Sequence, residues 1–291
     1  PLLALTPAVH EVVPREGGDE ATVAAIAAAG CQEAVVLPSS FRSAGLVWRA
    51  GVPYRWGYRG GWRSPLLAPP VPGRGRRKRH QSEDYRQLLE AMAVDPPASW
   101  VPSLPRTPQM LAKGAELLSR ARVPAEGPRV GLFAGAEFGP SKRWPWRRFA
   151  DLARQLRRER PEMSALILAG PKEVWLAVRI HEESGKIHPV VGPDLDLGGL
   201  AAVLAHLDLL VTNDSGPMHL AAALGVPCVA LFGPTDPRRT APAGEGHRVL
   251  STGRWCSPCF RRRCPLLHHR CLRDIGVGEV AAAALAALPA R

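Results

Sequence analysis

Two segments of the chain combine glycines, charged side chains and the expected start of a helix. Residues 135–145 read Gly-Ala-Glu-Phe-Gly-Pro-Ser-Lys-Arg-Trp-Pro, and residues 211–219 read Val-Thr-Asn-Asp-Ser-Gly-Pro-Met-His. Each follows an apolar run typical of a buried strand. In an open parallel sheet, ligands bind beyond the carboxyl ends of the strands, where a helix N-terminus offers free N–H groups to phosphate. The two segments together predict a crevice for a small nucleotide, with Lys142 as the cation for a diphosphate.

The same residues also have plain structural interpretations. Asp214 could cap the following helix, His219 could be a first-turn residue of that helix, and Lys142 could be an exposed loop lysine. Lysine is scarce in this chain, since only five of its 38 basic residues are lysines, so a lysine inside a motif is informative. The formal net charge of +12 suggests an anionic partner, but a coding bias toward arginine would produce the same charge.

From Arg129 onward, short apolar runs alternate with amphipathic ones, as in strand–helix units around a parallel sheet. In the helix expected to begin at Trp144-Pro145, four apolar residues share one face: Phe149, Leu152, Ala153 and Leu156. Further helices are expected near 175, 200 and 218. The expected strands are 129–133, 165–168, 189–191, 209–211 and 228–232.

The first third of the chain predicts a similar unit. Residues 9–13 and 34–37 are strand-like and flank an alanine-rich helix from 21 to 29. A stretch rich in proline and arginine follows, so we expect two domains, residues 1–122 and residues 123–291. No run approaches the roughly 20 apolar residues of a membrane-spanning helix, and no signal-peptide pattern opens the chain, so we expect a cytoplasmic protein.

In order and spacing, these motifs resemble those of the ADP-heptose:lipopolysaccharide heptosyltransferase family, in particular the enzymes that add the second heptose. The resemblance rests on residues 135–145, 213–219 and 231–235, and it extends to residues 36–44 and 51–60. It implies an α/β fold of the GT-B type, in which two Rossmann-like domains face a cleft. It also implies inverting transfer of heptose from ADP-heptose to the inner core of lipopolysaccharide.

The resemblance assigns roles to individual residues. Lys142, Asp214 and His219 correspond to the catalytic group, with Lys142 on the diphosphate. Glu173 resembles the acidic residue that holds the ribose hydroxyls, although a solvated glutamate at a helix start would look the same. The donor-binding residues that it implies are Gly135, Ala136, Glu137, Lys142, Glu173, Asp214, Ser215, Gly216 and His219.

Four arginines of the N-terminal domain are candidates for the acceptor site. Guanidinium groups bind the carboxylates and phosphates of an inner-core lipid well, but ordinary surface arginines would give the same pattern. The candidates are Arg42, Arg55, Arg59 and Arg63.

The general base of the family is an aspartate in a glycine-rich loop after the first strand. This chain opens at a point that resembles a later part of that domain, so the resemblance implies that the first strand, its loop and the following helix are absent. Asp19, in Gly17-Gly18-Asp19, mimics the motif, but we interpret it as a helix cap. We therefore expect nucleotide binding to survive and transfer to be impaired in this chain.

Four of the six cysteines lie within sixteen residues: Cys256, Cys259, Cys264 and Cys271. Their spacing suits a structural zinc site, in which His268 or His269 could replace one thiolate, but a disulfide or free thiols fit it too. The family resemblance implies no cofactor for catalysis itself.

Two other functions compete with the transferase. A nucleotide-sugar-binding homologue without catalysis would share the crevice, and residues 73–80 with the arginine-rich cysteine loop suggest a nucleic-acid-binding protein. The basic run has no interleaved aromatic residues, so we favour the transferase and expect no nucleic-acid partner. The expected partners are ADP-heptose, the inner-core acceptor and the anionic inner face of the cytoplasmic membrane, which the enzyme would contact peripherally.

Overall fold

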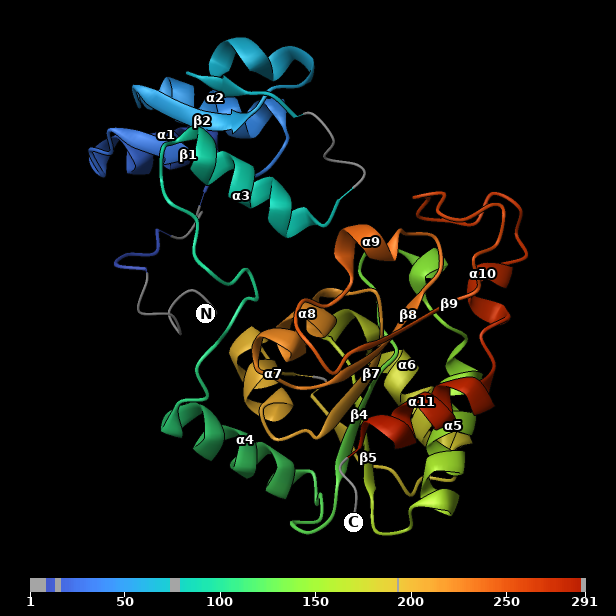
Figure 1. Cartoon of the computed structure of the whole chain (residues 1–291). Coiled ribbons are helices and arrows are strands. Elements are labelled where there is room, and N and C mark those ends of the chain that lie inside the picture. Colours follow the sequence, from blue (N-terminus) through green and yellow to red (C-terminus); the bar gives the residue numbers. More distant parts are fainter. Residues whose placement is uncertain (1–8, 14–16, 74–78, 193, 289–291) are drawn as a thin grey trace. The chain divides into compact units, whose positions relative to one another are not determined.

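The computed structural model describes residues 9–13, 17–73, 79–192 and 194–288. The chain forms two compact units, Ala8–Trp100 and Val101–Arg291 (Figure 1). Each unit contains a parallel sheet with its own apolar core. The architecture is therefore α/β with two parallel sheets, in agreement with the expected fold class.

The sheet of the C-terminal unit has the strand order β6-β5-β4-β7-β8-β9, and all neighbours in it are parallel. Leu132 aligns with Ile167 on β5 and with Val211 on β7. The near-continuous apolar runs form these strands because both faces of a parallel sheet are buried. The chain moves outward from β4 to β6 and then returns to β7, so the order reverses between β4 and β7. The strands are β4 (Arg129–Phe133), β5 (Ser164–Leu168), β6 (Val190–Val191), β7 (Leu209–Asn213), β8 (Cys228–Phe232) and β9 (Arg248–Ser251).

Helices cover both faces of this sheet (Figure 1). One face packs against α5 (Trp146–Glu159), α6 (Val174–Glu183) and α11 (Val277–Ala287), and the other against α4 (Pro108–Arg120), α7 (Leu197–Leu204) and α8 (Gly216–Ala223). The predicted apolar face of α5 is confirmed, because its four residues are fully buried. Burial of each leucine or phenylalanine there contributes roughly 1.5–3 kcal/mol. Short helical turns complete the unit: η4 (Pro140–Lys142), η5 (Pro171–Glu173), α9 (Pro237–Thr240) and α10 (Arg270–Arg273).

The N-terminal unit has a smaller sheet with the parallel order β1-β2-β3. Its core consists of two small clusters, one around Val36, Ala44 and Leu67 and one around Tyr58, Val71 and Leu88. Its elements are α1 (Asp19–Ala28), β1 (Glu33–Val35), α2 (Phe41–Arg49), β2 (Tyr54–Tyr58), η2 (Gly61–Leu66), β3 (Pro70–Val71) and α3 (Gln81–Ala91).

Two predictions about the fold need correction. Residues 9–13 form no strand, and Val12 and Val13 stay exposed because no described strand pairs with them. The C-terminal unit begins at Val101 rather than at residue 123. The reason is that α4 packs against α7 and contributes buried residues to the core of that unit.

None of the helices within the described ranges is both long and apolar enough to cross a membrane.

Candidate functional site

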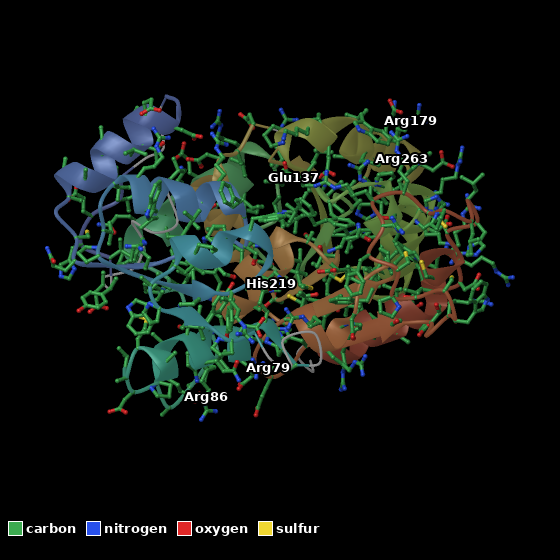
Figure 2. The ribbon with its side chains drawn as sticks, turned by 90° about the horizontal axis from the view of Figure 1, so that it is seen from above. Arg79, Arg86, Glu137, Arg179, His219 and Arg263 are labelled. Carbon is green, nitrogen blue, oxygen red and sulfur yellow. The ribbon has the colours of Figure 1, made fainter. Side chains whose placement is uncertain are left out.

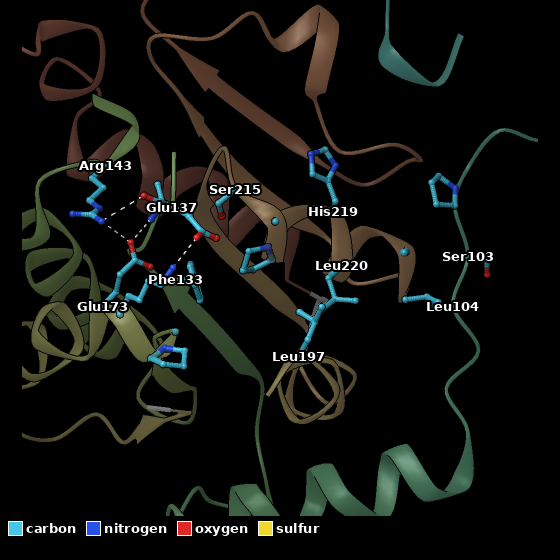
Figure 3. Close-up of a pocket in the computed structure, with 18 residues that line it drawn as sticks. Ser103, Leu104, Phe133, Glu137, Arg143, Glu173, Leu197, Ser215, His219 and Leu220 are labelled. Atoms are coloured by element: carbon cyan, nitrogen blue, oxygen red, sulfur yellow. Dashed lines mark hydrogen bonds and ion pairs between the residues drawn. The ribbon is translucent and has the colours of Figure 1, made fainter. Parts of the chain in front are cut away.

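The loops after β4 and β7 meet at the carboxyl ends of the two central strands, where the strand order reverses. Open parallel sheets bind ligands at this position. A cavity of about 840 Å³ opens there, within the size range of ligand pockets. Arg143 and Glu173 lie on one side of it, and Ser215, His219 and Leu220 lie on the other (Figure 3). A cavity is therefore present between the two motifs, and of the predicted donor-binding residues Gly135, Lys142 and Asp214 are not among those that line it.

Asn213, the last residue of β7, fixes the loop that follows β4. Its Nδ2 donates to the carbonyl oxygens of Ala134 (2.8 Å) and Gly135 (3.3 Å), and its Oδ1 accepts from the N–H of Trp144 (2.9 Å). Asn213 is fully buried, so these hydrogen bonds satisfy groups that water cannot reach. One amide thus holds both ends of the loop that carries Lys142. The sequence pattern did not single out Asn213, although it stands next to Asp214 in the motif.

Lys142 and Asp214 form a nearly buried ion pair. They are not among the residues that line the cavity, but each directly precedes one that is, Arg143 and Ser215. Lys142 Nζ lies 2.6 Å from Asp214 Oδ2, and the two side chains are 13% and 5% exposed. The hydroxyl of Thr235, from the loop after β8, donates to the same oxygen at 2.5 Å. The ammonium also lies 4.9 Å from the centre of the Phe138 ring, a cation–π contact. Lys142 is therefore not an ordinary exposed loop lysine.

The interpretation of Asp214 as a helix cap is wrong. The N-cap residue of α8 is Ser215, and its side chain forms no capping hydrogen bond. The N–H groups of the first turn of α8 therefore start at the cavity wall without a side-chain cap, and a helix N-terminus favours negative charge there. The cavity is lined by Ser215, Gly216 and His219, and Figure 3 shows His219 on α8.

Glu173 is buried between two donors rather than solvated at a helix start. Its Oε1 accepts from the N–H of Ala136 (2.8 Å) and from Arg143 Nη2 (2.7 Å), and the residue is 8% exposed. A Cβ atom on Gly135 would lie 1.9 Å from Glu173 Oε2, so the glycine is required for this approach. Arg143, which follows Lys142 directly, was not among the predicted site residues.

Glu137 lines the cavity at its exposed edge. It pairs with Lys172 at 3.0 Å, and both side chains are more than four-fifths exposed. Such an exposed pair contributes little to stability.

The structure assigns backbone roles to two of the four predicted acceptor arginines. Arg55 donates to the carbonyl oxygens of Leu66 and Pro53, each at 2.8 Å. Arg63 is 3% exposed and donates to the carbonyl oxygen of Tyr58 at 2.9 Å. Pro53 precedes β2, Tyr58 is its last residue and Leu66 is the last residue of η2, so the two guanidinium groups satisfy carbonyl groups at the ends of these elements.

Arg42 is held by Asp19, the alternative candidate for the general base. Arg42 Nε lies 2.9 Å from both carboxylate oxygens of Asp19, and this hydrogen bonding raises the pKa of Arg42. The cap interpretation of Asp19 is wrong as well, because Gly18 is the N-cap residue of α1. Arg59 is exposed, and within the described residues its side chain forms no hydrogen bond or ion pair.

A second cavity, of about 450 Å³, lies on the N-terminal unit, and four of the residues that line it, 60–63, directly follow Arg59. Trp62 is 89% exposed and Phe41 is 58% exposed, and both line this cavity with Ser39, Gly60, Gly61 and Arg63. Exposed aromatic side chains around a hollow are typical of a ligand or partner site.

The four clustered cysteines, all free thiols, line one small cavity of about 20 Å³ together with His268 and His269. Burial, and then the neighbouring thiol groups, raise the pKa of Cys271. Among the described residues, no three His, Cys, Asp or Glu side chains are placed so that they could hold a metal ion. The structural zinc site therefore stays a prediction, which metal analysis of the purified protein decides.

Most of the basic run at 73–80 lies outside the described residues. Arg79, at its end, forms an ion pair with Asp84 at 3.3 Å. Other arginines, such as Arg179 on α6 and Arg263 near the cysteines, lie at the outer surface of the C-terminal unit (Figure 2).

The chain matches the family described as glycosyltransferase family 9 (heptosyltransferase) over residues 25–269. It is 32% identical to lipopolysaccharide heptosyltransferase 2 of Escherichia coli strain K12 over 264 residues, which cover 86% of this chain and 76% of that protein. It is 31% identical to lipooligosaccharide heptosyltransferase 2 of Haemophilus influenzae, over 75% of this chain and 64% of that protein.

Solved structures agree with this match. The structure of E. coli ADP-heptose lipopolysaccharide heptosyltransferase II superimposes with a TM-score of 0.81 at 29% identity, covering 98% of this chain and 85% of that chain. An E. coli heptosyltransferase solved with ADP-2-deoxy-2-fluoro heptose shares the fold, with a TM-score of 0.67 at 21% identity over 97% of this chain and 84% of that chain. The α/β fold with two parallel sheets thus matches that of GT-B heptosyltransferases, and the chain belongs to glycosyltransferase family 9, the heptosyltransferase family.

Proposed function

We propose that the chain binds ADP-heptose in the C-terminal crevice and transfers the heptose, with inversion, to the inner core of lipopolysaccharide, as a heptosyltransferase II. One observation carries the proposal. The crevice at the ends of β4 and β7 places two cation–carboxylate pairs beside a cavity of about 840 Å³, in a chain of the heptosyltransferase family.

The donor would use groups that the structure already holds in place. A diphosphate would compete with Asp214 for Lys142 and would meet the N-terminal turn of α8 at Ser215 and Gly216. Ala136 and Arg143 both donate to Glu173 Oε1, so within the described residues Oε2 remains an acceptor for a ribose hydroxyl. A related E. coli heptosyltransferase was solved with an ADP-heptose analogue, which supports this choice of donor.

In the proposed reaction, the acceptor hydroxyl attacks the anomeric carbon and the bond from that carbon to the phosphate oxygen breaks. ADP leaves with the bonding electrons, and its new charge is stabilised by Lys142 and by the helix N-terminus. The hydroxyl proton passes to a general base, and the aspartate that the family resemblance implies for this role is not among the residues of the site described above. Asp19 is not favoured for this role, because its carboxylate is engaged by Arg42.

For the acceptor we propose Arg59 and the neighbouring cavity with Trp62. Arg59 offers a guanidinium group to a carboxylate or phosphate, and the exposed indole offers an apolar face to a sugar ring. Peripheral contact with an anionic membrane surface stays part of the same proposal and follows from the net charge of +12.

The proposal is tested by calorimetry with ADP and by transfer assays with a panel of ADP- and UDP-sugars on one heptosylated acceptor. We expect ADP to bind and ADP-heptose to be the preferred donor. ADP binding without turnover would fit either the binding homologue or the impaired transfer expected from the sequence, and absence of ADP binding would refute the donor site. Charge reversal Arg59→Glu should raise the acceptor KM, whereas Arg86→Glu, which alters an exposed arginine on α3 of the same unit, should not.

A further inference from the structure

The cysteine-rich segment, residues 256–271, contacts the two loops that carry Lys142 and Thr235, the two residues that bind the carboxylate of Asp214. The lysine loop, residues 135–145, follows β4, and the threonine loop, residues 233–236, follows β8. β4 and β8 are not neighbours, because β7 lies between them. The pairing of the strands therefore does not by itself bring the two loops into contact with the same segment.

The lysine loop is attached to the segment immediately before Lys142. Ser141 Oγ donates to the carbonyl oxygen of Arg261 at 2.6 Å, and the N–H of Ser141 donates to the carbonyl oxygen of Arg262 at 3.3 Å. Gly139, at φ +144°, packs so closely that an added Cβ would lie 2.6 Å from the carbonyl oxygen of Arg262. The guanidinium of Arg262 lies 5.5 Å from the centre of the Phe138 ring, which also contacts Lys142.

The threonine loop is attached to the same segment. The N–H of Phe260 donates to the carbonyl oxygen of Pro234 at 2.8 Å, and the hydroxyl of Ser257 donates to the carbonyl oxygen of Gly233. An added Cβ on Gly233 would lie 2.6 Å from Leu272 and 3.2 Å from Cys271 Sγ. The small cavity of the four cysteines lies at this junction, because Ser141 and Pro234 also line it.

We propose that the cysteine-rich segment positions the donor-binding cation, with Ser141 and Ser257 as its positioning residues. The ion pair of Lys142 with Asp214 and the hydroxyl of Thr235 join the two loops on the side of the crevice. The segment is hydrogen-bonded to the same two loops at Ser141, which directly precedes Lys142, and at Gly233, two residues before Thr235. A change in the segment therefore alters the position of Lys142. This inference rests on the proposed role of Lys142 at the diphosphate.

The test compares three serine-to-alanine variants whose hydroxyl groups all donate to a backbone carbonyl. Ser141→Ala and Ser257→Ala remove contacts of the segment. Ser184→Ala is the matched control, because the buried Ser184 donates to the carbonyl oxygen of His181 at 3.1 Å on the outer helix α6. The measurements are the dissociation constant of ADP, the donor and acceptor KM, and the melting temperature.

We expect Ser141→Ala and Ser257→Ala to weaken ADP binding and raise the donor KM by about 5- to 30-fold, the lower part of the range for loss of a hydrogen bond to a buried group. The acceptor KM should not change. Ser184→Ala should lower the melting temperature as much as the other two without changing ADP affinity. Ser141→Thr, which keeps the hydroxyl, should bind ADP within about threefold of the parent chain.

Two kinds of failure are distinguishable. If the parent chain binds no ADP, or if Lys142→Met binds it as tightly as the parent, the proposed function fails. If the parent binds ADP and Lys142→Met does not, but Ser141→Ala and Ser257→Ala bind like Ser184→Ala, the positioning role is refuted. If Ser141→Ala does not fold, Ser257→Ala decides the question by the same comparison.

Discussion

The ion pair of Lys142 and Asp214 allows ligand binding and fold stability to be separated by a double-mutant cycle. Lys142→Met removes the charge but keeps most of the side-chain length. It leaves the carboxylate of Asp214, which is 5% exposed, without its cation. Breaking a buried pair in this way costs about 3–5 kcal/mol, and we expect the lower end because Thr235 still donates to Asp214.

The two single variants should differ sharply in ADP binding. Loss of a charge-assisted contact is worth roughly 1.5–3 kcal/mol, so Lys142→Met should weaken ADP binding by about 10- to 150-fold. Asp214→Asn removes the carboxylate that competes with the diphosphate for Lys142. It should therefore bind ADP at least as tightly as the parent chain, although it is less stable.

The double variant Lys142→Met with Asp214→Asn decides the reasoning. Two neutral side chains leave no buried charge, so urea unfolding should show stability within about 1 kcal/mol of the parent. Calorimetry should show that ADP binding stays as weak as in Lys142→Met. Recovery of ADP affinity in the double variant, or an equal loss in Asp214→Asn, would show that the pair acts on the ligand only through the fold.

Three further predictions follow from local geometry. Gly135→Ala should lower ADP affinity by more than about tenfold, because its Cβ would lie 1.9 Å from Glu173 Oε2. Calorimetry should show a smaller loss of ADP affinity when the same change is made in Glu173→Ala. An equal loss in that background would show that the contact with Glu173 is not the cause. Burial lowers the pKa of His188 to about 4, so its neutral ring favours the folded state above pH 6.5. Up to about 3 kcal/mol of that stability is lost as the pH falls toward 4. Urea unfolding of His188→Gln should therefore depend less on pH than that of the parent chain, and an unchanged pH dependence would exclude His188 as the cause. Burial raises the pKa of Cys228 to about 12, so alkylation of the native protein, read by mass spectrometry, should label the exposed Cys31 and leave Cys228 unlabelled until denaturant is added.

Strands β4 to β8 could be predicted because each contains a short apolar run, whereas β9 was not predicted, because its mostly exposed sequence Arg-Val-Leu-Ser has only two apolar residues. β4, β7 and β8 are buried on both faces, and a sheet with helices on both sides selects such runs. β2 was not predicted, because its sequence Tyr-Arg-Trp-Gly-Tyr has no continuous apolar run and buries only its last two residues. α4 was assigned to the wrong domain, since its packing partner α7 follows it by more than seventy residues.

The location of the site was predictable, but its internal pairing was not. Both motifs lie at strand ends, and that position follows from the sequence alone. The pairing of Lys142 with Asp214, and of Arg143 with Glu173, depends on which strands are neighbours in the sheet. Arg55 and Arg63 were assigned to a ligand, because no local pattern distinguishes an arginine that binds backbone carbonyl groups from one that faces a substrate.

The two cations beside the cavity are each neutralised by a carboxylate of the protein itself. A simple anion such as inorganic phosphate must displace Asp214 from Lys142, or Glu173 from Arg143, and gains only the N-terminal turn of α8 in return. Under the proposed function a nucleotide could do so, because its base and ribose would occupy the rest of the cavity at the same time. The built-in carboxylates therefore act as competitors that exclude small cellular anions, and they make occupancy of the crevice depend on recognition of the whole donor.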